Sequence, residues 1–272
     1  MRKHILIIVA AFIALPLASC TINIDGETFG GETVKGNGNI VTQTLDISAF
    51  NDLSIALPAT VNFTVSNDYT CTVRVDENIF EYLDIKMKDN ELHLGKKQAN
   101  KNTRLKATEF VIELTAPSLK EIDLAGSGTL NVLSPLAGEE MEVNIAGSGD
   151  IVLHETVSVN SIDLSVAGSG DLLSNELVAD KLEANIAGSG DLKVVSGTVR
   201  EAKANVAGSG DIVLTCEIEN LEADIAGSGD IKARVNGKLK YGIIGSGDIG
   251  YYGNPVVEGE KVGASSVKRL GD

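Results

Sequence analysis

The residues of this chain that could perform chemistry recur in one short motif, Gly-Ser-Gly-Asp. The motif begins at Gly147, Gly168, Gly188, Gly208, Gly227 and Gly245, and an earlier Gly-Ser-Gly begins at Gly126. A serine hydroxyl could act as a nucleophile, a glycine-rich backbone could bind phosphate, and a carboxylate could bind a cation. Each of these chemistries requires different neighbouring residues.

The motif lacks what the first two chemistries need. A phosphate-binding loop reads Gly-x-x-x-x-Gly-Lys-Ser/Thr and opens a helix, whereas neither the lysine nor a helical period follows here. A nucleophilic serine needs a histidine base, and His93 and His154, the two histidines beyond the first 19 residues, do not recur with the motif. We therefore assign no catalytic residue and do not expect an enzyme.

The six aspartates of the motif are expected to form a column, with one carboxylate in each repeat. Two unit charges about 5 Å apart repel by roughly 0.8 kcal/mol in water and by about 3 kcal/mol at an effective dielectric of 20. Either the aspartates cap turns by bonding nearby backbone, or the column binds calcium; no other cofactor is expected. The candidate calcium ligands are Asp150, Asp171, Asp191, Asp211, Asp230 and Asp248.

The elements that position these groups are short strands with one buried side. Before each motif, apolar residues alternate with polar ones, as in Val143, Asn144 and Ile145, and this period of two is typical of a half-buried strand. Ile or Leu follows each aspartate and starts a second strand. Each repeat is thus strand, glycine corner, strand, variable loop and strand. The corner residues include Gly147, Ser148, Gly149, Gly168, Ser169 and Gly170, and the serines are expected to bond backbone or one another.

The spacing of the motifs predicts the fold. Successive copies are 21, 21, 20, 20, 19 and 18 residues apart, and a degenerate copy, GASSV, begins at Gly263. A period near 20 is too short for a four-stranded propeller blade and fits one turn of a solenoid. The sequence therefore predicts an all-β, single-stranded parallel β-helix, with right-handed coiling as the default for parallel crossovers.

The first 19 residues are expected to be a signal peptide rather than part of the fold. Arg2 and Lys3 precede an apolar run, and "LASC" resembles a bacterial lipobox, which implies cleavage before Cys20 and lipidation of that residue. An ordinary signal peptide with a chance cysteine is the alternative. Loss of this segment changes the formal charge from −15 to −17, which disfavours nucleic acid as a partner. Cys71 and Cys216 are expected to be small buried residues.

We divide the mature chain into three parts. Residues 20–35 are polar and glycine-rich, and are expected to form a lipidated tether. Residues 36–118 are expected to form an irregular N-terminal part of the solenoid, in which "ALPATVNF" takes the place of "AGSGDIVL"; a separate α+β domain is the alternative. Residues 119–272 hold the repeats and a C-terminal cap. One helical turn is expected near residues 78–82.

The motif and its flanks resemble one known family. "AGSGD[IL]" at this spacing, after "GNGNIVTQTLDISAFNDLSI" and "RVDENIFEYLDIKMKDNELHL", is similar to the head GIN domain family, whose members are described as putative autotransporter adhesins. The resemblance covers about residues 36–268 and implies a β-helical fold, a place at the cell surface and an adhesive role. It implies no catalytic residue. The lipobox makes this chain a lipoprotein member.

Two classes of function follow. The leading hypothesis is a non-catalytic, adhesin-like or structural module, anchored by lipid at the cell envelope, most simply in the outer membrane or at the cell surface. Its ligand would be carbohydrate or protein, or a second copy through the solenoid ends. The alternative is a polysaccharide-active, pectinase-like β-helix enzyme that uses the aspartates, although paired carboxylates in glycosidases need unlike environments and a repeated column makes them alike.

Overall fold

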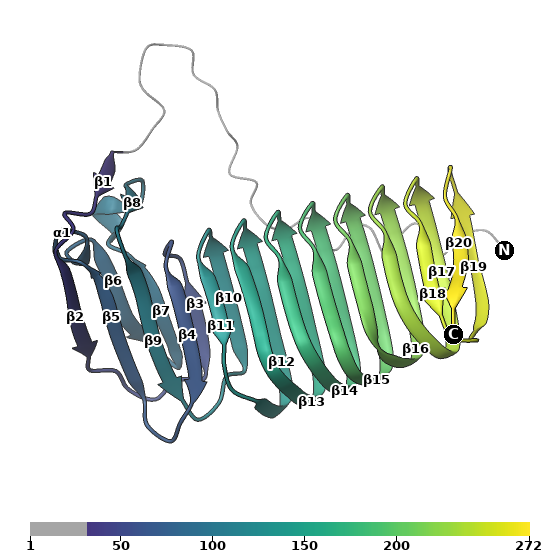
Figure 1. Cartoon of the computed structure of the whole chain (residues 1–272), viewed down its shortest axis with the longest axis horizontal. Coiled ribbons are helices and arrows are strands. Elements are labelled where there is room, and N and C mark those ends of the chain that lie inside the picture. The colour runs from purple at the N-terminus through teal and green to yellow at the C-terminus, as the bar shows by residue number, and fades with distance from the viewer. Residues whose placement is uncertain (1–31) are drawn as a thin grey trace, which may run out of the picture. The chain divides into compact units, whose positions relative to one another are not determined.

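The computed structural model describes residues 32–272, and these form one compact unit. The structure is 71% strand and 3% helix, and it consists of parallel coils stacked as a β-solenoid of about 8 turns, about 20 residues apart (Figure 1). The predicted all-β solenoid is therefore confirmed. The signal peptide, Cys20 and most of the expected tether lie outside the described residues.

Each repeat forms one long, bent strand that ends at the first glycine of a corner. Neighbouring strands pair in parallel with equivalent residues opposite one another, so that Gly147 lies beside Gly168 and Gly168 beside Gly188. The columns predicted from the repeat are thus real neighbours. The repeat strands are β12 (Leu136–Gly147), β13 (Asp150–Gly168), β14 (Leu172–Gly188), β15 (Leu192–Gly208), β16 (Ile212–Gly227) and β17 (Ile231–Gly245).

The core lies inside the coils and has three walls. In β13 the buried residues are Ile151 and Leu153, then Val157 and Val159, then Ile162 to Val166 at alternate positions. The expected variable loop between these walls is strand as well, because residues 156–159 pair with β14 and only the register shifts after Leu153. Fully burying one such aliphatic side chain contributes about 1.5–3 kcal/mol, and every coil repeats it.

The N-terminal part is built from shorter strands, one short α-helix and the 3-10 turn η2 (Gln98–Asn100) (Figure 1). Helix α1 (Glu77–Phe80) lies where a helical turn was expected, and β1 (Thr33–Lys35) shows that the last residues assigned to the tether pair with β8. The other elements are β2 (Ile40–Leu45), β3 (Asp52–Ile55), β4 (Thr60–Val65), β5 (Thr70–Asp76), β6 (Leu83–Lys88), β7 (Glu91–Lys96), β8 (Arg104–Lys106), β9 (Phe110–Ala116), β10 (Glu121–Gly126) and β11 (Thr129–Val132).

These strands stack in an order that differs from the sequence. β3 and β4 pair with β10 and β11, so residues 52–65 form a coil with "ALPA" at its corner. The later strands β7 and β9 pair with the opposite edges of β3 and β4. Antiparallel pairing of β2 with β5, β5 with β9, and β6 with β7 then covers this end of the solenoid.

The C-terminal end consists of β18 (Ile249–Tyr252), β19 (Val256–Val262) and β20 (Val267–Gly271). GASSV forms a further corner, in which Gly263 has φ +120° and a Cβ there would lie 2.1 Å from the Gly245 carbonyl oxygen. All of β19 is exposed. Lys261 stands beside Ile243, in a column of aliphatic residues, and Arg269 stands beside Tyr251, in a column that is apolar in the preceding repeats except at Ser174. The last coil is thus partly closed by charged side chains.

Two further observations concern the described part of the chain. Cys71 and Cys216 are free and buried, as expected, and burial raises the pKa of each thiol to about 12. Within residues 32–272, no helix has the length and hydropathy needed to cross a membrane.

Candidate functional site

The Gly-Ser-Gly corners stack directly on one another. Gly188 has φ +143°, which side chains disfavour, and a Cβ there would lie 2.1 Å from the carbonyl oxygen of Gly168. A Cβ on Gly190 would lie 2.0 Å from the carbonyl oxygen of Gly170. The first glycine is therefore required both for its positive φ and because a Cβ would clash with the neighbouring coil. The second glycine is required only because a Cβ would clash with the neighbouring coil.

The serines of the corners contribute through the backbone. The Ser169 amide donates to the carbonyl of Gly147 at 2.8 Å, and the Ser189 amide donates to that of Gly168 at 2.7 Å. Their side chains are exposed. In the described coils, we find no bond from one of these hydroxyls to the next, so the corner ladder is formed by backbone groups.

The aspartates form a column in which each carboxylate bonds the next coil. Oδ1 of Asp171 accepts from the amide of Asp191 at 2.9 Å, and Oδ1 of Asp191 accepts from that of Asp211 at 3.0 Å. The same bond joins Asp150 to Asp171, Asp211 to Asp230 and Asp230 to Asp248. At the end of the column, the Ser266 hydroxyl and amide bond Asp248 and hold the pKa of its carboxyl below the usual range, against the effect of burial. Each carboxylate thus satisfies a backbone N–H in the neighbouring coil.

The calcium hypothesis stays a prediction. Within residues 32–272, no group of three or more His, Cys, Asp or Glu side chains is placed to hold a metal ion. Calcium shared along the column would neutralise the repulsion between carboxylates and so raise the melting temperature. The double variant Asp191→Asn with Asp211→Asn should lose this increase. These substitutions keep an acceptor oxygen for each amide and remove two of the repelling charges, so stability without calcium should not fall. Calorimetry showing no heat and no shifted melt at millimolar calcium would contradict the hypothesis.

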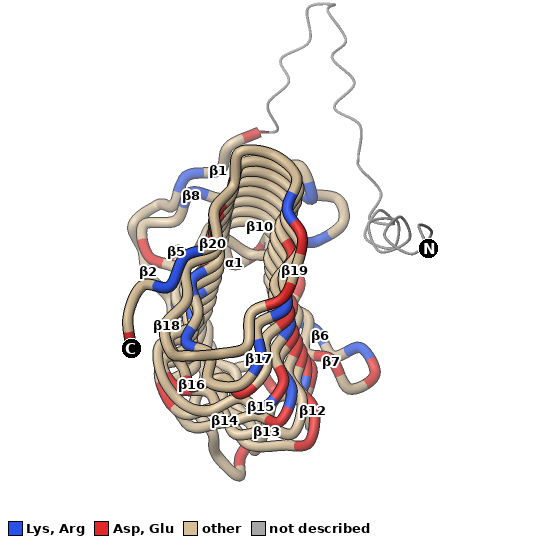
Figure 2. The backbone as a smooth tube through the Cα atoms, turned by 90° about the vertical axis from the view of Figure 1, so that its right-hand side faces the viewer, with Lys and Arg blue, Asp and Glu red and all other residues tan. Residues whose placement is uncertain are grey.

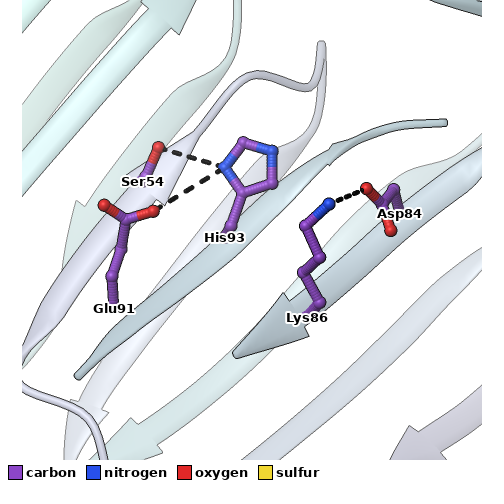
Figure 3. A network of polar contacts seen from close by, with 5 residues as sticks. All are labelled: Ser54, Asp84, Lys86, Glu91 and His93. Carbon is purple, nitrogen blue, oxygen red and sulfur yellow. Dashed lines mark hydrogen bonds and ion pairs between the residues drawn. The ribbon is translucent and has the colours of Figure 1, made fainter. Parts of the chain in front are cut away.

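A polar network near the N-terminal end contains a serine, a histidine and a glutamate (Figure 3). The Ser54 hydroxyl lies 3.3 Å from Nδ1 of His93, and the Glu91 carboxylate lies 4.0 Å from the same nitrogen. In a catalytic triad, the serine and the acid bond different ring nitrogens. Nε2 of His93 instead lies against Gly95, where an added Cβ would be 2.3 Å away. The arrangement therefore lacks the geometry of a proton relay.

A groove of about 620 Å³ crosses the strands from β12 to β17, beside the wall formed by residues 157–159 and their equivalents. Its floor is the backbone and buried side chains of Val159, Ala179 and Val199. The Arg200 guanidinium lies 3.3 Å from Asp180, and both side chains are half exposed. The polar side chains along the groove are Ser158, Asn160, Asp180, Thr198, Arg200, Glu217, Glu219 and Asn236.

A ladder of carboxylates follows the strands that precede the corners. Burial, together with Asp123, Glu142, Asp52 and Glu91, raises the pKa of Glu121. Burial, with Glu183 and Glu142, likewise raises the pKa of Asp163 despite a 2.7 Å bond from the Ser165 hydroxyl. Register places the members side by side in the order Glu91, Asp52, Glu121, Glu142, Asp163 and Glu183.

Fold and site together define a parallel β-solenoid protein whose repeated polar groups maintain the stacking of its coils. The chain belongs to the family described as putative auto-transporter adhesin, head GIN domain, which matches residues 49–175 and 146–255. The resemblance seen in the sequence is therefore confirmed. No match was found among curated proteins.

Solved structures agree with this assignment. A putative adhesin of Parabacteroides merdae is 29% identical with a TM-score of 0.82, and the match covers 88% of this chain and 100% of that one. A protein of Parabacteroides distasonis, described as a putative lipid binding protein, is 30% identical with a TM-score of 0.84 and the same coverage. A putative adhesin of Bacteroides fragilis, 20% identical with a TM-score of 0.65, shares the fold.

The groove is not evident from the sequence. Asn160, Asp180, Arg200 and Glu219 do not share a residue type, so no motif marks them. Their common feature is position: each follows a buried residue of the second wall. Aligning the repeats over their whole length, rather than around the glycines, would have placed them in one column.

Proposed function

We propose that this protein is a non-catalytic, adhesin-like binding module of the cell envelope, anchored through lipid on Cys20. Membership of the head GIN domain family supports the adhesive role. The described chain begins at Glu32, beside the covered end of the solenoid, where β1 pairs with β8. A lipid on Cys20 would therefore be connected, through residues 21–31, to the chain where it enters this end of the solenoid.

The observation that carries the binding role is the groove along β12–β17. Its 620 Å³ volume is in the range of ligand sites. Its side chains offer donors and acceptors in successive coils about 4.8 Å apart, which suits an extended polar chain. A carbohydrate or an extended protein segment meets that description. Self-association through solenoid ends remains a proposal for the C-terminal end alone, since antiparallel strands cover the other.

Binding of residues 21–272 to a glycan array and to surface protein extracts tests the proposal. The groove variant Asn160→Ala with Arg200→Ala should lose at least about tenfold in affinity, because a lost hydrogen bond to a charged group contributes about 1.5–3 kcal/mol. The control, Lys193→Ala with Lys232→Ala, changes exposed residues on another wall and should bind normally.

Three results would contradict parts of this proposal. Equal binding by the groove variant would place the ligand elsewhere. Binding to surface proteins but to none of the glycans would exclude carbohydrate as the ligand. Release of reducing ends from an acidic polysaccharide, lost on changing one aspartate but not its neighbours, would support the enzyme alternative.

A further inference from the structure

We propose that one charged side of the solenoid binds the same side of a second copy of this chain. This charged face consists of the outward side chains of the strands before six successive corners. Figure 2 shows basic and acidic residues mixed along this side, between β12 and β17. In the order of the coils, its residues are Glu140, Glu142, Asn144; Ser161, Asp163, Ser165; Lys181, Glu183, Asn185; Glu201, Lys203, Asn205; Asn220, Glu222, Asp224; and Lys238, Lys240, Gly242.

The register of the strands turns these residues into a regular grid. Lys181 pairs with Glu201, and Glu183 pairs with Lys203, in the adjoining strands β14 and β15. Equivalent positions in neighbouring coils lie about 4.8 Å apart. Each coil therefore contributes one row of three residues, and the six rows make three columns; the last row has only two side chains because its third residue is Gly242.

The charges of this grid reverse about a line between β14 and β15. A two-fold axis parallel to the strands at that line would place β14 over β15 of the second copy, β13 over β16, and β12 over β17. Lys181 then faces Glu201 of the second copy, and Glu183 faces Lys203 of the second copy. Further out, Glu140 faces Lys238, which also pairs with Glu258 of its own chain at 2.9 Å. Glu142 faces Lys240, which also pairs with Glu222 of its own chain at 2.7 Å. With their symmetry mates, these are eight contacts between opposite charges.

The remaining positions fit the same arrangement. In the third column, Ser165 faces Asp224 of the second copy, and Asn185 is buried and bonds Asn205 of its own chain at 2.7 Å, so no two like charges are opposed there. Asp163 meets Glu222 of the second copy as the single like-charged combination, occurring twice. Both acids already have partners within their own chain, since Asp163 accepts from Ser165 at 2.7 Å and Glu222 pairs with Lys240 at 2.7 Å.

The four charged residues nearest the axis have no ion-pair partner within their own chain. In the described chain, no ion pair involves Lys181, Glu183, Glu201 or Lys203, although other charges of the protein do form such pairs. The Glu201 carboxylate accepts a hydrogen bond from the Asn220 side-chain amide at 3.0 Å. The four residues line a shallow hollow of about 440 Å³ together with Lys238 and Lys240. Long side chains of a second copy could enter this hollow.

Other registers of the same face are less favourable. An axis through β14 would place Lys181 opposite Lys181 of the second copy, and Glu183 opposite Glu183 of the second copy. An axis between β13 and β14 would oppose Asp163 and Glu183, and also Glu140 and Glu201. Like charges in direct opposition suppress wrong pairings. The charge pattern therefore selects one register, with the two solenoids antiparallel.

The size of the face predicts a weak dimer. Five intervals of about 4.8 Å along the solenoid, and five residues along each strand, give an area on the order of 500 Å² per copy. About 1,000 Å² in total lies at the low end for specific interfaces. We expect a dissociation constant on the order of 0.1 mM in dilute salt. Salt at about 1 M, which shortens the Debye length to about 3 Å, should dissociate the dimer.

Sedimentation equilibrium of residues 21–272, which contain the whole compact unit, tests this proposal with charge-swapped variants. The acidic variant Lys181→Glu with Lys203→Glu, and the basic variant Glu183→Lys with Glu201→Lys, should each bind itself at least about tenfold more weakly. A mixture of the two should form a heterodimer. The variant with all four substitutions keeps the net charge and restores every opposite-charge contact, so it should dimerise like the original protein.

A control separates this face from overall charge. Lys193→Glu with Lys232→Glu changes the net charge as the acidic variant does, but on another wall, and should dimerise normally. A monomer at 1 mM protein in dilute salt would overturn the proposal. So would equal dimerisation of the acidic variant, or a monomeric four-residue swap with an unchanged melting temperature. None of these results depends on ligand binding in the groove, which lies on different residues.

Discussion

Alanine at Gly188 should destabilise the solenoid by about 3–5 kcal/mol, the largest effect expected for a single added methyl group in this protein. Two causes combine there. A non-glycine residue at φ +143° is strained, and the new Cβ would lie 2.1 Å from the carbonyl oxygen of Gly168. That oxygen belongs to backbone, so relief requires one coil to move away from the next. Urea unfolding followed by circular dichroism measures the loss.

Three other glycines separate these causes. Gly190→Ala adds a clash, 2.0 Å from the carbonyl oxygen of Gly170, and should cost about 1–3 kcal/mol. Gly126 has φ +104°, and a Cβ added there would have no atom within 4 Å. Gly126→Ala should therefore cost only the backbone strain, about 1–2 kcal/mol. Gly138→Ala meets only the Glu140 carbonyl oxygen at 3.9 Å and should cost nothing. Equal losses at Gly188 and Gly138 would show that stacking does not require the corner glycines.

Replacing Asp76 should loosen the N-terminal end of the solenoid. This carboxylate is buried and accepts from the amides of Gly38 at 2.8 Å and Thr108 at 2.7 Å. Ala would leave both amides unpaired, and Asn would turn a donor towards one of them. We expect both variants to lower the unfolding midpoint well below that of Asp84→Asn, a change to a partly exposed carboxylate that pairs with Lys86.

The pH dependence provides a second measurement at Asp76. Burial would raise the pKa of its carboxyl, but bonds from Thr108 and Gly38 outweigh burial and hold the pKa below its ordinary value. The carboxylate therefore contributes stability above the ordinary pKa, and this contribution disappears as pH falls through the lowered value. Between about pH 5 and pH 2, the original protein should lose more stability than Asp76→Asn. Parallel pH profiles would contradict this role.

The repeated part of the fold could be predicted from the sequence because each position recurs. Ile145, Val166 and Ile186 share an inward column, and one buried position in a repeat locates all the others. The partner of each aspartate could not be deduced in this way. The amide of one coil donates to the carboxylate of the coil before it. This hydrogen bond therefore depends on how two neighbouring coils are stacked, and not on the spacing of residues within one repeat.

The N-terminal part shows where sequence reasoning ends. "ALPATVNF" was correctly placed as an early coil, since its alternation matches that of the repeats. Nothing in the alternation of residues 91–96 or 110–116 indicates that these later strands lie outside β3 and β4. The charged face was missed for a related reason, because Lys181 and Glu201 look unremarkable until the strands are set side by side.

The out-of-sequence stacking of β3 and β4 bears on how the chain acquires its structure. A chain that emerges from its N-terminus presents residues 52–65 first, but both edges of that coil are completed only by residues 91–96, 110–116 and 121–132. Contacts between distant residues form slowly. Each later coil, by contrast, adds to an edge that already exists. We therefore expect the early coil to be the slow step of folding. A chaperone that binds the unfinished chain would then act mainly before residue 132 is available.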